Sequence, residues 1–159
     1  MRSSRLSTIE LERALNGIPA SGRTALYDAV EAGLSHLKKA TLDKKVLIVI
    51  SDGGDNASHK KFDQILEDAS RSEVVIYTIV LFDEDDRDRN PGILKKLAHA
   101  TGGEAFLPNT TSDVVPICRR IAEDIRNQYM LGYVPRNQVI ANGQHHEKYV
   151  VRTRAGYSA

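Results

Sequence analysis

The chain has 159 residues, 41% of them hydrophobic and 27% charged, with a formal net charge of +1. This length suits one domain with a sizeable core. Its near-neutral charge gives no global field that would attract nucleic acid or an anionic membrane. No apolar run approaches the roughly 20 residues of a membrane helix, and no apolar signal-peptide region is visible at the start. Because Cys118 is the one cysteine, an internal disulfide and a multi-cysteine metal site are excluded.

Helix and strand patterns alternate along most of the chain. The predicted elements, in chain order, are helices at 8–15 and 24–40, a strand at 45–50, a helix at about 62–69, a strand at 74–82, a helix from 91 to about 100, a short strand at 104–107 and a helix at about 114–125. Repeated strand–helix units of this length imply right-handed crossovers. The fold class is therefore predicted to be α/β, with a doubly wound, mostly parallel, Rossmann-like sheet and flanking helices.

The last 31 residues have a different pattern. Two further strands are predicted at Tyr129–Val134 and Tyr149–Thr153, and the polar segment between them shows no periodicity. We therefore expect residues 1–128 to form a partial α/β domain. Residues 129–159 are expected to be a C-terminal β extension packed on the same domain.

The most informative segment is the apolar run Val46–Ile50 followed by Ser51-Asp52-Gly53-Gly54-Asp55-Asn56. A continuous apolar run is typical of a strand buried on both faces of a parallel sheet. The glycine pair then forces a sharp turn at the carboxyl end of the strand, which is where open α/β sheets bind ligands. Asp52 is thus a candidate binding residue, and the alternative to this role is that it caps the next helix or shapes the turn.

Three segments resemble those of a known family when they are taken in order. Residues Gly22–Ala29 (GRTALYDA), Ile48–Gly53 (IVISDG) and Ala100–Phe106 (ATGGEAF) resemble the corresponding motifs of von Willebrand factor A-type (VWA) domains. The segment Ile121–Tyr133 is similar to the end of a bacterial subfamily of these domains. Together the likeness covers roughly residues 8 to 135.

The resemblance implies a metal-ion-dependent adhesion site, in which Mg²⁺ (or Mn²⁺ or Ca²⁺) sits on top of the sheet. The family takes its ligands from an Asp-x-Ser-x-Ser motif, a threonine before a helix and the aspartate of an (S/T)DG loop. The matching positions here are Thr24 and Asp52, with Ser51 and Asp55 as further candidates. No apolar strand with an Asp-x-Ser-x-Ser motif at its end precedes Thr24 in the sequence, so we expect an N-terminally truncated VWA domain.

The chemistry of Mg²⁺ limits what these residues can do alone. The ion requires about six oxygen ligands, and one hydroxyl with one carboxylate cannot hold it strongly. We therefore expect weak or absent metal binding in this fragment. Each residue also has a purely structural interpretation: Thr24 as a plain N-cap, Asp55 as a turn former, Asp28 as a solvated or capping residue, and Cys118 as a buried, inert thiol.

Two classes of function remain open. The first is a noncatalytic protein-binding or adhesion module, whose metal accepts a carboxylate from a partner. The alternative is a metal-dependent α/β hydrolase or phosphotransferase that uses Asp52. The sequence has no P-loop, no G-x-S-x-G motif and no Gly-rich dinucleotide fingerprint. We therefore favour the noncatalytic module, and the partner is expected to be a protein rather than nucleic acid or membrane.

The strand Lys45–Ile50 also predicts an association. In the family, the first strand lies beside this one, and without it the strand would present an exposed apolar edge. The edge could be covered by the tail strands, by a second copy, or by the missing piece supplied in trans. We predict a homo-oligomer through this strand. We expect the parent protein to be secreted or periplasmic, with any export signal outside this chain.

Overall fold

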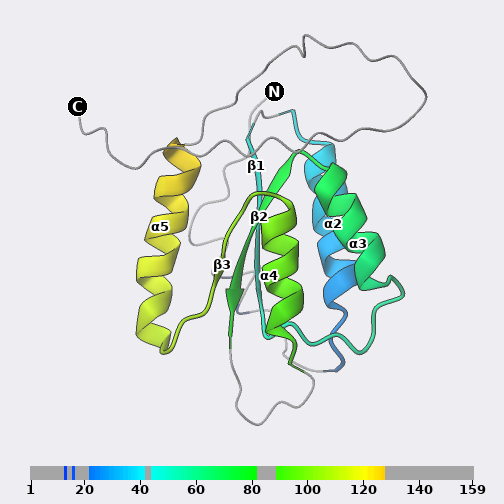
Figure 1. The fold of residues 1–159 in the computed structure, drawn as a ribbon, viewed down its shortest axis with the longest axis horizontal. Helices are drawn as coiled ribbons and strands as arrows, with labels where there is room; N and C mark the ends of the chain where they lie inside the picture. Colours follow the sequence, from blue (N-terminus) through cyan, green and yellow to red (C-terminus); the bar gives the residue numbers. More distant parts are fainter. Residues whose placement is uncertain (1–12, 14–15, 17–21, 42–43, 82–88, 128–159) are drawn as a thin grey trace. The chain divides into compact units, whose positions relative to one another are not determined.

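The structure is a computed structural model that describes residues 13, 16, 22–41, 44–81 and 89–127 (Figure 1). In chain order its elements are α2 (Leu26–Lys38), β1 (Lys45–Ser51), α3 (Phe62–Arg71), β2 (Val74–Val80), α4 (Pro91–Ala100), β3 (Ala105–Phe106), the 3₁₀ turn η1 (Thr111–Asp113) and α5 (Val114–Asn127). The predicted helix at 8–15, apart from Arg13, and the predicted C-terminal β extension lie outside the described residues.

The three described strands form one parallel sheet in the order β1-β2-β3. Lys45 pairs with Val74 at one end of the β1–β2 ladder and Ser51 with Val80 at the other, while Thr78 of β2 pairs with Ala105 of β3. Each parallel connection runs through a helix, α3 between β1 and β2 and α4 between β2 and β3, as parallel pairing requires. The predicted α/β class with a parallel sheet is confirmed.

One face of the sheet packs against α2, α3 and α4. Its core holds residues from all of these helices and from the strands, including Leu26, Val30, Leu34, Val49, Ile65, Ala69, Val74, Ile76, Val80, Leu94 and Leu97. The helix α2 lies especially close to β1, since a Cβ added at Gly33 would stand 3.1 Å from Cδ1 of Leu47. Apolar residues at helical spacing thus bury one stripe of each helix against the strands.

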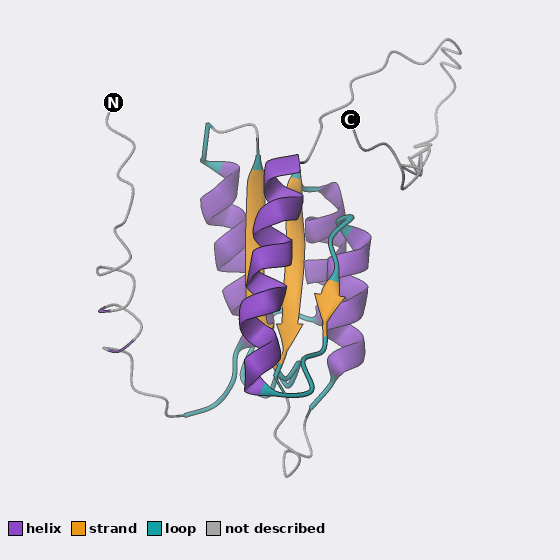
Figure 2. Cartoon of the chain, turned by 90° about the vertical axis from the view of Figure 1, so that its left-hand side faces the viewer, coloured by secondary structure: helices purple, strands orange, loops and turns teal. Residues whose placement is uncertain are grey.

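The opposite face is covered by α5 (Figure 2). Its cluster consists of Tyr77, Ile79 and Phe106 from the strands and Ile121 from α5, with partly buried neighbours Val46, Val75, Ile117 and Ile125. This cover does not extend along all of β1, because Ile48 is 47% exposed and Ile50 is 57% exposed. The expectation that this strand is buried on both faces is therefore wrong for the α5 face.

The helix α5 also corrects the interpretation of Cys118, which is exposed rather than buried. Ile117, Ile121 and Ile125 recur every four residues and form the stripe that faces the sheet. Cys118 is one position further round the helix, which is enough to take it out of the core. In the part of the chain that the structure describes, no helix has the length and apolar character to cross a membrane.

Candidate functional site

The segment that follows β1 turns sharply at the carboxyl end of the sheet. Gly53 has φ +87°, and a Cβ at this position would lie 2.2 Å from the carbonyl oxygen of Asn90. Asn90, just before α4, also donates its backbone N–H to the carbonyl of Asp52 at 3.2 Å. Only glycine fits both the backbone angle and the close approach. The turn is therefore held against the start of α4.

The side chains of Ser51 and Asp52 point back into this turn. The hydroxyl of Ser51 accepts a hydrogen bond from Gly53 N at 3.1 Å, and Oδ1 of Asp52 accepts one from Gly54 N at 2.9 Å. The same hydroxyl donates to Oδ1 of Asp52 at 3.3 Å. Both predicted residues thus shape the turn, and Asp52 lies half-buried at the end of β1.

Asp55 ties the loop to the first turn of α2. Its Oδ2 accepts from Tyr27 N at 3.0 Å and from the hydroxyl of Ser58 at 2.5 Å, while Oδ1 accepts from Ser58 N at 3.2 Å. Burial opposes the charge, but these hydrogen bonds outweigh it and hold the pKa of Asp55 below its usual value. The N-cap residue Ala25 makes no side-chain bond. The carboxylate that caps α2 therefore comes from a distant loop.

Asp28 makes the reverse connection, from α2 to the loop. Its carboxylate accepts from His59 N at 2.9 Å and from Lys60 N at 3.0 Å, and Nδ1 of His59 lies 2.9 Å from its Oδ2. The backbone bond from His59 is the largest cause that lowers the pKa of Asp28, from 3.8 to about 2. Asp28 and Asp55 thus form a reciprocal clasp between α2 and the loop.

Thr24 meets the same loop through its backbone. Its N–H donates to Oδ1 of Asn56 at 2.9 Å, and its carbonyl accepts from Asn56 N and Ala57 N, each at 3.0 Å. The neighbouring Arg23 donates to the carbonyl of Asn56. Since the N-cap position belongs to Ala25, Thr24 is not the cap of α2. All four predicted positions nevertheless lie at one end of the sheet, on the loop or directly before α2.

The donors at this end of the sheet do not by themselves fit a tightly held Mg²⁺ ion. In the described ranges, no group of three or more His, Cys, Asp or Glu residues could hold a metal. Both oxygens of Asp55 already accept hydrogen bonds from Tyr27 or Ser58. About six oxygen ligands are required, and waters alone would have to supply most of them. Metal binding at Thr24 and Asp52 stays a prediction.

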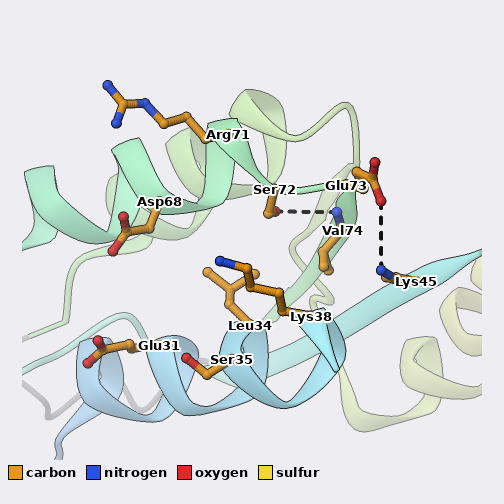
Figure 3. Close-up of a pocket in the computed structure, with 10 residues that line it drawn as sticks. All are labelled: Glu31, Leu34, Ser35, Lys38, Lys45, Asp68, Arg71, Ser72, Glu73 and Val74. Carbon is orange, nitrogen blue, oxygen red and sulfur yellow. Dashed lines mark hydrogen bonds and ion pairs between the residues drawn. The ribbon is translucent and has the colours of Figure 1, made fainter. Parts of the chain in front are cut away.

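A separate cleft of about 640 Å³ lies near the amino ends of β1 and β2 (Figure 3). Its charged lining mixes both signs: Glu31, Lys38, Lys45, Asp68, Arg71 and Glu73. Two of these residues, Lys45 and Glu73, form an ion pair at 3.7 Å. Balanced charges of this kind select no class of ligand, and the cleft contains none of the predicted site residues.

Comparison with known proteins informs the fold. No protein-family model and no curated protein matches the chain. Among solved structures, it is similar to an aerotolerance-related membrane protein from Bacteroides fragilis, with 14% identity over 76% of this chain and 69% of that one and a TM-score of 0.55. An uncharacterized membrane spanning protein from Vibrio fischeri matches with 18% identity and a TM-score of 0.45.

The two similar structures are matched over different shares of their own length. The match to the Vibrio fischeri protein covers 71% of this chain but spans only 64% of that protein's length. The Bacteroides fragilis protein shares the overall fold of this chain. We conclude that the chain has a Rossmann-like α/β fold of a kind also found in that protein.

Proposed function

We propose that the chain is a noncatalytic protein-binding module of the VWA type. The partner would contact the loop from Ser51 to Asn56 and the adjoining start of α2. The observation that carries this proposal is the reciprocal clasp of Asp28 and Asp55, which holds a polar loop in one shape at the carboxyl end of β1. Loops at this end of a parallel sheet are where α/β folds bind their ligands.

The fixed shape of the loop supports a binding role. The N–H of Asn90 anchors the loop through the carbonyl of Asp52, and Asn56 anchors it to Thr24. A loop that is already ordered loses less conformational entropy when a partner binds. His59, with its side chain 95% exposed, borders the clasp and can contact a partner. The loop is therefore suited to recognition as it stands.

The positions Thr24 and Asp52 correspond to metal ligands in the VWA family, with Ser51 and Asp55 beside them. A divalent cation there would accept a carboxylate oxygen of the partner at its open coordination position. The family's Asp-x-Ser-x-Ser ligands have no counterpart at this site, because the one match in the sequence, Asp68–Ser72, lies at the end of α3 beside the cleft at the amino ends of β1 and β2. We therefore expect this chain alone to bind Mg²⁺ weakly or not at all.

The contact of Ser58 favours binding over catalysis. A nucleophilic serine needs a base that accepts its proton, usually an imidazole. The hydroxyl of Ser58 instead donates to the carboxylate of Asp55. This bond holds the loop in place, which supports a structural and binding role for this end of the sheet.

Calorimetry and amide NMR spectra test the proposal together. With Mg²⁺ and an N-acetylaspartate probe, we expect weak shifts confined to amides of the Ser51–Asn56 loop and the start of α2. These shifts should be lost in Asp52→Asn and kept in Asp63→Asn, an exposed acid on α3. A calorimetric Mg²⁺ site of micromolar affinity that Asp52→Ala abolishes would overturn the expectation of weak metal binding.

The competing enzymatic function has its own test. A metal-dependent phosphatase assay on the same preparations should show no turnover above background. Turnover that depends on Mg²⁺ and disappears in Asp52→Asn would contradict the noncatalytic proposal. Probe shifts that lie elsewhere on the sheet would contradict the proposed position of the binding surface.

A further inference from the structure

His59 is held against α2 by two of its own nitrogen atoms. Its backbone N–H donates to Oδ2 of Asp28 at 2.9 Å, and its ring Nδ1 lies 2.9 Å from the same oxygen. The backbone N–H of Lys60 donates to the other oxygen, Oδ1, at 3.0 Å. The imidazole ring therefore has a fixed orientation, although its side chain is 95% exposed.

The contact with Asp28 decides which ring nitrogen carries the proton. The hydrogen bonds from His59 and Lys60 lower the pKa of Asp28 to about 2, which keeps its carboxyl ionised at neutral pH. An ionised carboxylate only accepts hydrogen bonds, so Nδ1 of the neutral ring is the donor. Nε2 of the neutral ring carries the lone pair, and a further proton binds there.

We propose that protonated His59 binds a carboxylate of the protein partner, so that partner binding strengthens on acidification without a metal ion. This inference rests on the proposed function, because it concerns the same end of the sheet and the same partner group. The described donors there do not fit a tightly held Mg²⁺ ion. A proton on Nε2 supplies a positive charge and an N–H donor beside the loop instead. Such charge-assisted hydrogen bonds are stronger than neutral ones.

The charges around His59 give the direction of the pH dependence. The ionisable groups on the surrounding elements are Asp28 and Glu31 on α2, Asp55, Lys60 and Lys61 on its own segment, and Asp63 and Asp68 on α3. Among these types of side chain, only histidine ordinarily titrates between about pH 6 and 8. Glu31 and Lys60 form an ion pair at 3.0 Å, so their charges offset each other.

Protonation of His59 changes the sign of its interaction with an anion. While the ring is neutral, the carboxylates of the clasp, Asp28 and Asp55, repel a partner carboxylate. When the ring is protonated, its charge offsets that of Asp28 and its outward N–H attracts the partner. The ring is already oriented, so binding costs little side-chain entropy. Exposed ion pairs are weak, and we expect binding to be about threefold tighter.

NMR of the imidazole ring in the full chain tests the orientation of His59. Long-range proton–nitrogen spectra at about pH 8 should show that the main neutral form carries its proton on Nδ1. Addition of acid should place the second proton on Nε2, with Nδ1 still protonated. A neutral ring with its proton mainly on Nε2 would overturn the inference, because Asp28 would then not orient the ring as proposed.

Titration with N-acetylaspartate in EDTA tests the binding step. The dissociation constant, measured from amide shifts near His59, should be about threefold lower at about pH 6 than at about pH 8. His59→Asn keeps an N–H donor near the position of Nδ1 but has no Nε2, so it should lose this pH dependence. The matched control is His99→Asn, at an exposed histidine in the last turn of α4, which should keep it. The neutral probe N-acetylasparagine amide should show no such dependence.

The outcomes separate this inference from the proposed function. Loop shifts that appear with Mg²⁺ but do not strengthen at the lower pH would overturn the role of His59 alone. Absence of probe shifts near the loop under all conditions would overturn both. A pH dependence that persists unchanged in His59→Asn would assign it to another group and would also overturn the inference.

Discussion

The two faces of the sheet differ sharply along the same strand. Val49 points to the face that α2, α3 and α4 cover and is 9% exposed, whereas the next residue, Ile50, points to the α5 face and is 57% exposed. Both are β-branched apolar residues in one continuous run. The comparison teaches that an apolar strand can hold the core together with one face while part of its other face stays exposed.

The largest expected difference is in the free energy of unfolding, between variants on the two faces of the sheet. Ile76→Ala, at a fully buried position on the three-helix face, should lower the free energy of unfolding by about 2–5 kcal/mol. Ile50→Ala should cost less than about 1 kcal/mol in dilute protein, because its side chain is largely hydrated already. Urea unfolding monitored by circular dichroism measures both. Equal losses would mean that the α5 face is covered after all.

The next effect concerns the loop at the end of β1. Gly53→Ala must relieve a 2.2 Å approach to Asn90 as well as adopt a positive φ, and should cost about 2–3 kcal/mol. The matched control is Gly102→Ala, which has φ +79° and no atom within 4 Å of the added carbon. It should cost about 1 kcal/mol, the penalty of the backbone angle alone. Thermal unfolding of the two variants distinguishes packing from backbone strain.

A smaller effect should appear on acidification of the clasp. The pKa of Asp28 is about 2 in the folded chain, below the ordinary value of 3.8. Since the folded-state pKa is depressed, the stabilisation is fully present above 3.8 and is lost as the pH falls towards 2. Asp28→Asn should therefore flatten the dependence of the urea midpoint on pH in this window, and Asp63→Asn should not. An unchanged pH profile in Asp28→Asn would contradict the clasp.

The smallest change in unfolding free energy is expected at the exposed ion pair of Arg120 and Glu104, beside β3. Arg120 donates to Glu104 at 2.7 Å and its guanidinium lies 5.3 Å from the ring centroid of Phe106. Both partners of the ion pair are exposed, so the Arg120→Ala variant should lose less than about 1 kcal/mol. We assign most of this loss of unfolding free energy to the contact with the Phe106 ring rather than to the ion pair. The loss should therefore persist in high salt. A larger, salt-sensitive loss would contradict this assignment.

The sequence was sufficient to predict most of the fold. Helical spacing in α2 and the apolar runs of β1 and β2 predicted a parallel α/β sheet, and the Gly53–Gly54 turn predicted where the loop would lie. These signals are local, because periodicity and turn chemistry depend on neighbouring residues. The structure bears them out because the same apolar stripes form its core.

The missed features depend on residues that are distant in the sequence. The clasp joins Asp28 to His59 and Asp55 to Tyr27, and no local pattern indicates that these pairs meet. The open face of β1 was missed for a similar reason, since an apolar run has the same composition with one cover or two. Cys118 was predicted to be buried but is exposed, because it lies one position past the buried stripe of α5. Helical periodicity does not fix the edge of such a stripe to a single residue.

Amide hydrogen exchange of the loop after β1 tests the central claim most directly. If the clasp of Asp28 and Asp55 holds this loop in one shape, the amides of Tyr27, Ser58 and His59, which donate to these carboxylates, should be protected from exchange. The protection of the His59 amide should be lost in Asp28→Asn and kept in Asp63→Asn. Fast exchange of all three amides in the wild-type chain would contradict the account.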